Sequence, residues 1–164
     1  MRSILEPYWN TELPIYNLSQ SELKKKGINC LLLDVDGTLI NRKSNKVPKA
    51  VKYWICESKK FFSLYLISNN PSKKRIGEIA RELEIRYKYN ALKPRKNITL
   101  HAISEFNFES KNIAIIGDRI FTDIIVGNRC NIKTILVKRL NKDGLPIRFN
   151  LTLLIEKLIS FFIR

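Results

Sequence analysis

Four short apolar runs, separated by segments of helical periodicity, restrict the fold of this chain more than any other feature. The runs cover 29–33, 62–67, 112–116 and 132–137. Apolar runs of this length, rich in branched aliphatic residues, suit strands of a parallel sheet that is buried on both faces. Helical patterns lie at 19–26, 48–60, 71–84, 95–105, 120–130 and 150–162. The alternation predicts an α/β fold with a doubly wound parallel sheet.

The length of 164 residues suits one domain. We expect an N-terminal arm and short helix over 1–27, an α/β core over 28–140, and a C-terminal loop and helix over 141–164. No window is apolar enough for a membrane span and the start lacks a secretory signal, so we expect a cytoplasmic protein. The three cysteines form no CxxC pair, which argues against a disulfide framework or a zinc site.

The charge balance points to an anionic partner. Thirty Lys and Arg against fifteen Asp and Glu give a formal net charge of +15. Nucleic acid, anionic lipid and phosphorylated metabolites all fit such a charge, and a merely solvated basic surface fits it equally well.

Four of the five aspartates fall in two tight pairs. Asp34 and Asp36 follow the first apolar run, and in an extended chain they project from the same side. Asp118 and Asp123 follow the third run, and the carboxyl ends of parallel strands share one edge of the sheet. Carboxylate and carbonyl oxygens in such a cluster describe a hard-cation site, magnesium above all. Gly37 lets the chain turn with exposed N–H groups, which predicts an anion cradle.

These residues resemble the four signature motifs of the haloacid dehalogenase-like (HAD) phosphatases, in the right order. The motifs are DVDGT at 34–38, Ser68-Asn69, Lys93-Pro94, and Gly117-Asp118 with Thr122-Asp123. The resemblance implies a Rossmann-like, HAD-like fold. No cysteine has an arginine six residues downstream, and the chain has no RHG or GxxxxGK sequence. Cysteine-dependent, phosphohistidine and P-loop chemistries are therefore excluded.

The resemblance also implies a mechanism. Asp34 would attack phosphorus and form an aspartyl-phosphate, while Asp36 would protonate the leaving oxygen and later activate water. Mg²⁺ would bind Asp34, the carbonyl of Asp36, and Asp118. Lys93 would neutralise charge in the transition state. Asp123 would orient Lys93 or a water molecule on the metal.

The substrate phosphate would be held by the Ser68 hydroxyl and the Asn69 backbone N–H, together with Gly37 and Thr38 of the first motif. Lys93 is not the only basic candidate for its role. Competing positions nearby are Lys88, Lys96 and the KKR sequence at 73–75.

Neither interval between the motifs can hold a cap domain. Only 31 residues separate Asp36 from Ser68, and 23 separate Asn69 from Lys93. An open site suits a substrate whose bulk stays outside it. Within the superfamily the chain most resembles the YqeG-like subfamily (subclass IIIA) and the phosphatidylglycerophosphate phosphatases of mitochondria, plastids and cyanobacteria. The segments that carry this resemblance are 117–129, 134–137, ISNN and ALKPR, whereas Gly37 departs from the Asn of many members.

This resemblance implies a phosphatase that converts phosphatidylglycerophosphate to phosphatidylglycerol, peripheral on the inner face of an anionic membrane. Basic segments after each strand are expected to surround the mouth of the site and attract such a surface. The apolar stripe of the final helix, Leu151, Leu154, Ile155, Leu158, Ile159 and Phe162, either packs on the sheet, which is favoured, or adds interfacial anchoring.

Three other readings stay open. An uncapped oligomeric phosphatase could act on a soluble sugar or nucleotide phosphate, with a neighbouring subunit as the lid, but the sequence leaves any homo-oligomer undetermined. A polynucleotide end phosphatase would also suit the basic rim, although few aromatic residues there could stack on bases. A non-enzymatic binding protein is disfavoured by the intact Asp34 and Asp36.

Overall fold

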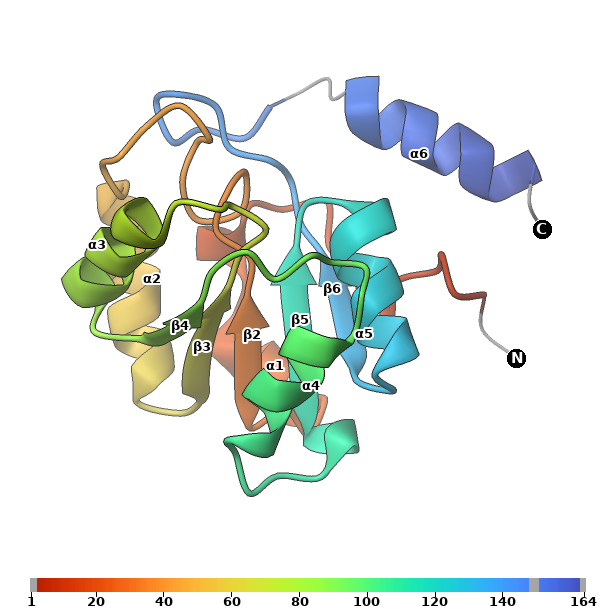
Figure 1. Ribbon diagram of the computed structural model, residues 1–164, viewed down its shortest axis with the longest axis horizontal. Helices are drawn as coiled ribbons and strands as arrows, with labels where there is room; N and C mark the ends of the chain where they lie inside the picture. Colours follow the sequence, from red (N-terminus) through yellow and green to blue (C-terminus); the bar gives the residue numbers. More distant parts are fainter. Residues whose placement is uncertain (1–2, 148–150, 163–164) are drawn as a thin grey trace.

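A six-stranded, entirely parallel sheet lies at the centre of the protein (Figure 1). The computed structural model describes residues 3–147 and 151–162. In spatial order the strands are β1 (Trp9–Asn10), β6 (Lys133–Leu136), β5 (Ile113–Gly117), β2 (Cys30–Leu33), β3 (Ser63–Ile67) and β4 (Arg86–Lys88). The predicted α/β class and doubly wound parallel sheet are confirmed.

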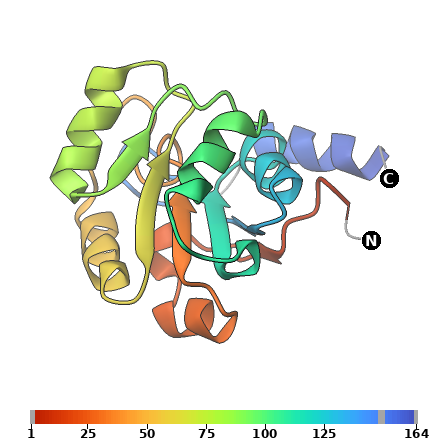
Figure 2. The same ribbon diagram turned by 60° about the horizontal axis from the view of Figure 1, so that its bottom comes forward.

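Helices cover both faces of the sheet (Figure 2). In chain order they are η1 (Ile15–Asn17), α1 (Gln20–Lys25), α2 (Lys49–Lys59), α3 (Lys73–Leu83), α4 (Asn97–Ser104), η2 (Ser110–Asn112), η3 (Ile120–Ile124), α5 (Ile125–Arg129) and α6 (Leu151–Phe162). The first three α-helices pack into one core and α4 with α5 into a second core on the other face. Serine caps begin two of them, since Ser19 accepts from Glu22 N and Ser72 from Arg75 N.

The inner strands supply side chains to both cores, which explains their unbroken apolar sequences. In β2, Leu31 and Leu33 belong to the core under α1–α3, whereas Cys30 and Leu32 belong to the core under α4 and α5. Because side chains alternate between the two faces of a strand, both sets must be apolar when both faces are covered.

The order of the strands places a crevice between β2 and β5. From β2 the chain proceeds outward through β3 and β4, and it then crosses to β5 on the other side of β2. Such a reversal of winding direction opens a crevice at the carboxyl ends of the two strands, where ligands bind in open α/β sheets. Asp34 and Asp118 are the first residues after these strands.

The N-terminal segment is more than the arm that we expected. Trp9 and Asn10 form β1, which pairs with β6 at the edge of the sheet. Ile15, Leu18 and Leu23 are fully or almost fully buried in the main core. This segment therefore completes one face of the fold, and a two-residue strand carries no periodic signal by which the sequence could predict it.

The predicted stripe of the final helix does not pack on the sheet, because its described side chains Leu154, Ile155, Leu158 and Ile159 are exposed. The helix packs instead through Leu153, against a small cluster that contains Ile120 of η3 and Leu136 of β6. The side chains of Leu151 and Phe162, which complete that stripe, lie outside the described residues. Figure 1 places α6 beside the end of the sheet at which the strand arrows point. Within the described ranges, no helix has the length and apolar character required to cross a bilayer.

Candidate active site

The site is assembled where parallel strands end side by side. Leu33 of β2 lies opposite Ile116 of β5, and the backbone N–H of Asp34 donates to the carbonyl of Ile116 over 2.9 Å. Pairing therefore continues into the first residue beyond the strand and fixes Asp34 beside Asp118. Ser68 follows β3 on the other side of β2.

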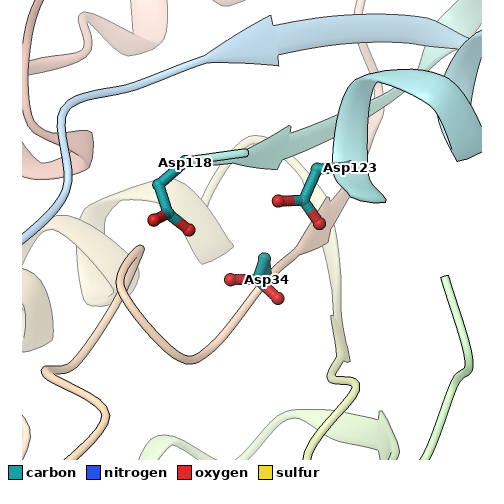
Figure 3. Close-up of side chains that lie close together, drawn as sticks. All are labelled: Asp34, Asp118 and Asp123. Carbon is teal, nitrogen blue, oxygen red and sulfur yellow. The ribbon is translucent and has the colours of Figure 1, made fainter. Parts of the chain in front are cut away.

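Three buried carboxylates converge at this edge. Asp34, Asp118 and Asp123 each offer an oxygen within 4.8 Å of the other two, and all three side chains point toward a common centre (Figure 3). Asp123 comes from η3, which begins two residues after Asp118 and turns back toward the end of β5. A side chain at Gly117 would collide with the Asp123 carboxylate, which explains the glycine at the end of β5.

Lys93 is the buried cation of this cluster. Its Nζ donates to Asp34 Oδ1 over 2.7 Å, to Asp123 Oδ1 over 2.6 Å and to the Ile67 carbonyl over 3.0 Å. The side chain is only 1 % exposed. Of its competitors, Lys88 pairs with Glu105 and Arg75 pairs with Asp36, whereas Lys93 pairs with Asp34 and Asp123.

The three carboxylates carry more negative charge than the one buried lysine can neutralise. Burial raises the pKa of Asp34 to about 6, an effect that Lys93 opposes and Asp123 reinforces. Burial, with Asp34 and Asp123 nearby, also holds the pKa of Asp118 well above its ordinary value. Burial alone would lower the pKa of Lys93, but the attraction of Asp123 and Asp34 outweighs it, so Lys93 stays protonated. The site favours an additional cation.

The residues present fit a divalent metal ion. Thr38 is buried, and its hydroxyl lies within hydrogen-bond distance of two carboxylates, 3.2 Å from Asp34 Oδ2 and 3.3 Å from Asp118 Oδ1. The other oxygen of Asp118 is buried, and among the described residues no donor forms a hydrogen bond with it. Arg139 Nε lies 3.2 Å away but outside hydrogen-bond geometry. A buried carboxylate oxygen without a donor, beside two further carboxylates, is a donor set for a hard cation.

Asp123 is a candidate metal ligand that the sequence analysis did not assign to the metal. Its ligand atom belongs to the three-carboxylate cluster. Both of its oxygens are engaged by the protein, however, Oδ1 by Lys93 and Oδ2 by the N–H of Arg119. The predicted ligands were Asp34, Asp118 and the carbonyl of Asp36, and Asp118 has the least engaged carboxylate.

The N–H of Gly37 does not form the anion cradle that the sequence predicts, whereas the contact of Thr38 with phosphate stays a prediction. The N–H of Gly37 donates to the carbonyl of Ile40 over 2.7 Å, so it is not free to cradle an anion. The glycine is needed instead because its φ is +102° and because a Cβ would lie 2.6 Å from the Asp118 carboxylate. Thr38 faces the carboxylates, and neither residue lines the pocket.

Asn69 of the second motif holds the third motif in place by hydrogen bonds. Asn69 accepts from the N–H of Lys93 and donates to its carbonyl, at 2.7 and 2.8 Å, so its side chain holds the Lys93 segment in place. Ser68 is buried, and its hydroxyl accepts from the N–H of Asn70 over 3.1 Å. Both residues line the pocket, where they were predicted to meet phosphate.

Asp36 stands apart from the three-carboxylate cluster. Arg75 Nη1 donates to its Oδ1 over 2.7 Å and Asn70 Nδ2 to its Oδ2 over 2.8 Å. The sequence analysis named Arg75, within the KKR sequence at 73–75, as a competitor for the role of Lys93 and as part of the basic rim, not as a partner of Asp36. An ion pair between positions 36 and 75 has no local sequence signal, because it depends on where α3 begins in space.

The pocket above these residues is small and polar. Its volume is about 40 Å³, room for roughly three water molecules. It is lined by the charged or polar residues Asp34, Asp36, Arg42, Ser68, Asn69, Asn70, Lys93, Arg119, Thr122, Asp123 and Arg139. A cavity of this size can take a phosphoryl group and leaves the remainder of a larger substrate outside.

Glu156 is a buried residue of α6 that the sequence analysis missed. It is 2 % exposed, and its Oε2 accepts from the N–H of Ile120 over 2.8 Å at the start of η3. Arg119, which lines the pocket, lies 3.5 Å from its other oxygen. The final helix is therefore fastened to the segment that carries Asp118 and Asp123.

Comparisons with known proteins agree with this geometry. Residues 91–144 match the family model described as HAD-hydrolase-like. The "Probable phosphatase YqeG" of Bacillus subtilis is 28% identical over 138 residues, which cover 83% of this chain and 80% of that protein. The chain is therefore similar, over most of its length, to a probable phosphatase and, over residues 91–144, to the HAD-like hydrolases, as the four motifs predicted.

Solved structures of the superfamily share the fold. The cobalt-bound deoxy-D-mannose-octulosonate 8-phosphate phosphatase (YrbI) of Haemophilus influenzae superimposes with a TM-score of 0.56 at 15% identity, over 70% of each chain. The 3-deoxy-D-manno-octulosonate 8-phosphate phosphatase of Yersinia pestis superimposes with a TM-score of 0.51 at 15% identity, over 70% of this chain and 66% of that one. The HAD-like fold is thereby confirmed.

Proposed function

We propose that this HAD-type phosphatase uses Mg²⁺ and an aspartyl-phosphate on Asp34 to hydrolyse phosphatidylglycerophosphate at an anionic membrane surface. The observation that carries the catalytic part is the buried cluster of Asp34, Asp118 and Asp123 around Lys93, at the carboxyl ends of β2 and β5. Asp34 and Asp118, with the carbonyl of Asp36, would hold the ion, whose charge offsets the repulsion between a carboxylate and a phosphate dianion.

The protein side chains divide the chemistry between them. Asp34 attacks phosphorus, and Lys93 fixes its carboxylate from one side over 2.7 Å. Asp36 gives a proton to the leaving oxygen and afterwards takes one from the water that releases phosphate. Asp123 holds Lys93 in place through the 2.6 Å bond. Ser68 and the N–H of Asn69 are the proposed contacts for phosphate oxygens.

The lipid substrate is supported by the shape and charge of the mouth. The pocket holds little beyond a phosphoryl group, so the rest of a substrate stays outside it. Three arginines line the pocket: Arg42, Arg119, which also lies 3.5 Å from Glu156, and Arg139, which also lies 3.2 Å from Asp118. The polar, phosphorylated head group of an anionic lipid supplies negative charge in that position. Few basic residues are required, because each Lys or Arg near an anionic leaflet contributes about 1 kcal/mol.

The final helix supports the membrane part of the proposal. Glu156 fastens one side of α6 to the segment after β5, while Leu154, Ile155 and Leu158 stay exposed. An exposed apolar helix face beside a basic mouth is the arrangement by which peripheral proteins settle into the head-group region. A second copy of the chain is the less favourable occupant, since each copy carries a net charge of +15.

A phosphate-release assay tests the substrate. We would compare, with Mg²⁺, phosphatidylglycerophosphate in anionic vesicles with a soluble sugar phosphate and a 3′-phosphorylated oligonucleotide, using Asp34→Asn as the blank. We expect the lipid to have a kcat/KM at least tenfold higher than either soluble substrate. Faster turnover of the sugar phosphate or the oligonucleotide would replace the lipid proposal with the corresponding alternative.

Vesicle flotation tests the membrane contact separately. We expect Leu158→Glu, at a position that is 52% exposed, to reduce flotation with anionic vesicles and leave p-nitrophenyl phosphate hydrolysis unchanged. Tyr53→Glu is the matched control, because Tyr53 is a 71% exposed apolar residue on α2. Equal flotation of both variants and the parent chain would contradict the role of α6.

A further inference from the structure

Both oxygens of Asp36 are held by the segment that follows β3. Arg75 Nη1 donates to Oδ1 over 2.7 Å, and Asn70 Nδ2 donates to Oδ2 over 2.8 Å. The two partners of the ion pair are shielded, with side chains 13% exposed for Asp36 and 15% for Arg75. Most surface ion pairs are exposed and contribute little, whereas this one holds a carboxyl group in the pocket wall.

The same guanidinium also binds the loop over 41–46. Arg75 Nη2 donates to the carbonyls of Ser44 and Asn41, at 2.8 and 3.4 Å, and Nε donates to Asn45 Oδ1 over 3.1 Å. This loop carries Arg42 to the mouth of the pocket. One side chain therefore sets the relative positions of the Asp36 carboxyl and the loop beside it.

The local structure orients Arg75 for these contacts. Arg75 lies in the first turn of α3, where its N–H donates to the capping Ser72 hydroxyl over 3.2 Å. Asn70 is held by two further bonds: its Oδ1 accepts from the N–H of Ser72, and its own N–H donates to Ser68 Oγ. The planar fork of arginine presents its donors in fixed directions from three nitrogens, so one side chain can reach the Asp36 carboxylate and the carbonyls of the loop over 41–46 together.

The two bonds to Asp36 differ in strength. A bond from a guanidinium to a carboxylate is charge-assisted and stronger than a bond from a neutral amide. The bond from Asn70 to Oδ2 is therefore the weaker of the two, and Oδ2 is the oxygen that the protein holds less firmly.

We propose that Arg75 is a positioning residue that fixes Oδ1 of Asp36, so that Oδ2 exchanges the proton with the leaving group and with water. The inference rests on the proposed role of Asp36 in proton transfer. In the first half reaction the bond from phosphorus to the leaving oxygen breaks, and the proton on Oδ2 passes to that oxygen. In the second half a proton from the attacking water returns to Oδ2.

The leaving group distinguishes positioning from general structural damage. An alkyl phosphate releases a strongly basic alkoxide that needs the proton, whereas p-nitrophenolate leaves without one. We expect Arg75→Ala to lower kcat/KM for an alkyl phosphomonoester about 10- to 100-fold, the scale of a displaced catalytic group. For p-nitrophenyl phosphate the expected fall is less than about threefold.

Three further variants complete the test. Asp36→Asn should show the same discrimination between the two substrates, and Lys74→Ala, the exposed neighbour of Arg75, should show none. Free guanidinium at low millimolar concentration should restore part of the alkyl phosphatase activity of Arg75→Ala. If Arg75→Ala does not fold, Arg75→Gln takes its place, and the measured quantity is again the loss of kcat/KM for the alkyl phosphomonoester relative to the loss for p-nitrophenyl phosphate.

The outcomes distinguish the positioning role of Arg75 from the proton-transfer role of Asp36. Discrimination by Asp36→Asn without discrimination by Arg75→Ala would overturn the positioning role alone. Equal losses on both substrates for both variants would overturn the proton-transfer role of Asp36. Because both substrates are small and soluble, neither result depends on the lipid assay.

Discussion

Removal of one buried negative charge should stabilise the metal-free protein while it abolishes the response to metal. The change is Asp118→Asn. The Asp118 carboxylate is 1 % exposed, one of its oxygens has no hydrogen-bond donor among the described residues, and Asp34 and Asp123 repel it. An amide of the same shape removes the repulsion and the desolvation of a charge.

The expected gain follows from the strain on Asp118 itself. Burial first, and then Asp34 and Asp123, hold the pKa of Asp118 well above its ordinary value, and Arg139 offsets only part of this. A tenfold change in a protonation equilibrium corresponds to about 1.4 kcal/mol. Relieving part of this strain should raise the free energy of unfolding by about 2 kcal/mol, or roughly 4–8 °C in Tm for a chain of this size. The site itself would lose a predicted metal ligand.

Thermal unfolding in EDTA and in Mg²⁺ measures both effects. At free Mg²⁺ of about 100 times Kd, the parent chain should gain about 2.7 kcal/mol, and the variant should gain less than about 0.5 kcal/mol. Asp143→Asn is the matched control, because Asp143 is exposed and distant from the cluster in sequence. A lower metal-free Tm for Asp118→Asn, or an undiminished shift with Mg²⁺, would refute the reasoning.

Two further predictions concern the same charges. The Tm of the metal-free protein should fall as pH rises from about 4 to about 6. Burial raises the pKa of Asp34 to about 6, so over this range the folded state holds a proton that the unfolded chain releases. Calorimetry in EDTA measures the Tm, and a Tm that rises over that range would contradict the prediction. Lys93→Met should lower the free energy of unfolding by about 3–5 kcal/mol, because two buried carboxylates lose their cation. Urea denaturation measures this loss, with Lys88→Met as the control. Lys88→Met breaks a partly exposed ion pair and should lower the free energy of unfolding by less than about 1 kcal/mol. Equal stability of the two variants would disprove the prediction.

Much of the site could be predicted from sequence because its residues follow directly from the strands. Leu33, Ile67 and Gly117 each end a strand, and the next residue in each case is a predicted site residue. Parallel pairing then brings distant positions to one edge, whatever the intervening helices contain. Four motifs in order were sufficient to indicate the family and the chemistry.

The edge strands were beyond the reach of sequence patterns. β1 has two residues and β4, with the sequence Arg-Tyr-Lys, has three. Neither forms an apolar run, because an edge strand is covered less completely than the strands inside the sheet. Their positions are decided by pairing with β6 and β3, which only the folded chain provides.

The sequence by itself determined the fold class and brought Asp34 and Asp118 to one edge of the sheet, since strand periodicity and strand ends are local properties. Only the tertiary structure decided which basic side chain faces which acid: Lys93 toward Asp34, and Arg75 toward Asp36. Those pairs join residues 59 and 39 positions apart. Their geometry depends on helix placement and side-chain direction, which many long-range contacts determine together.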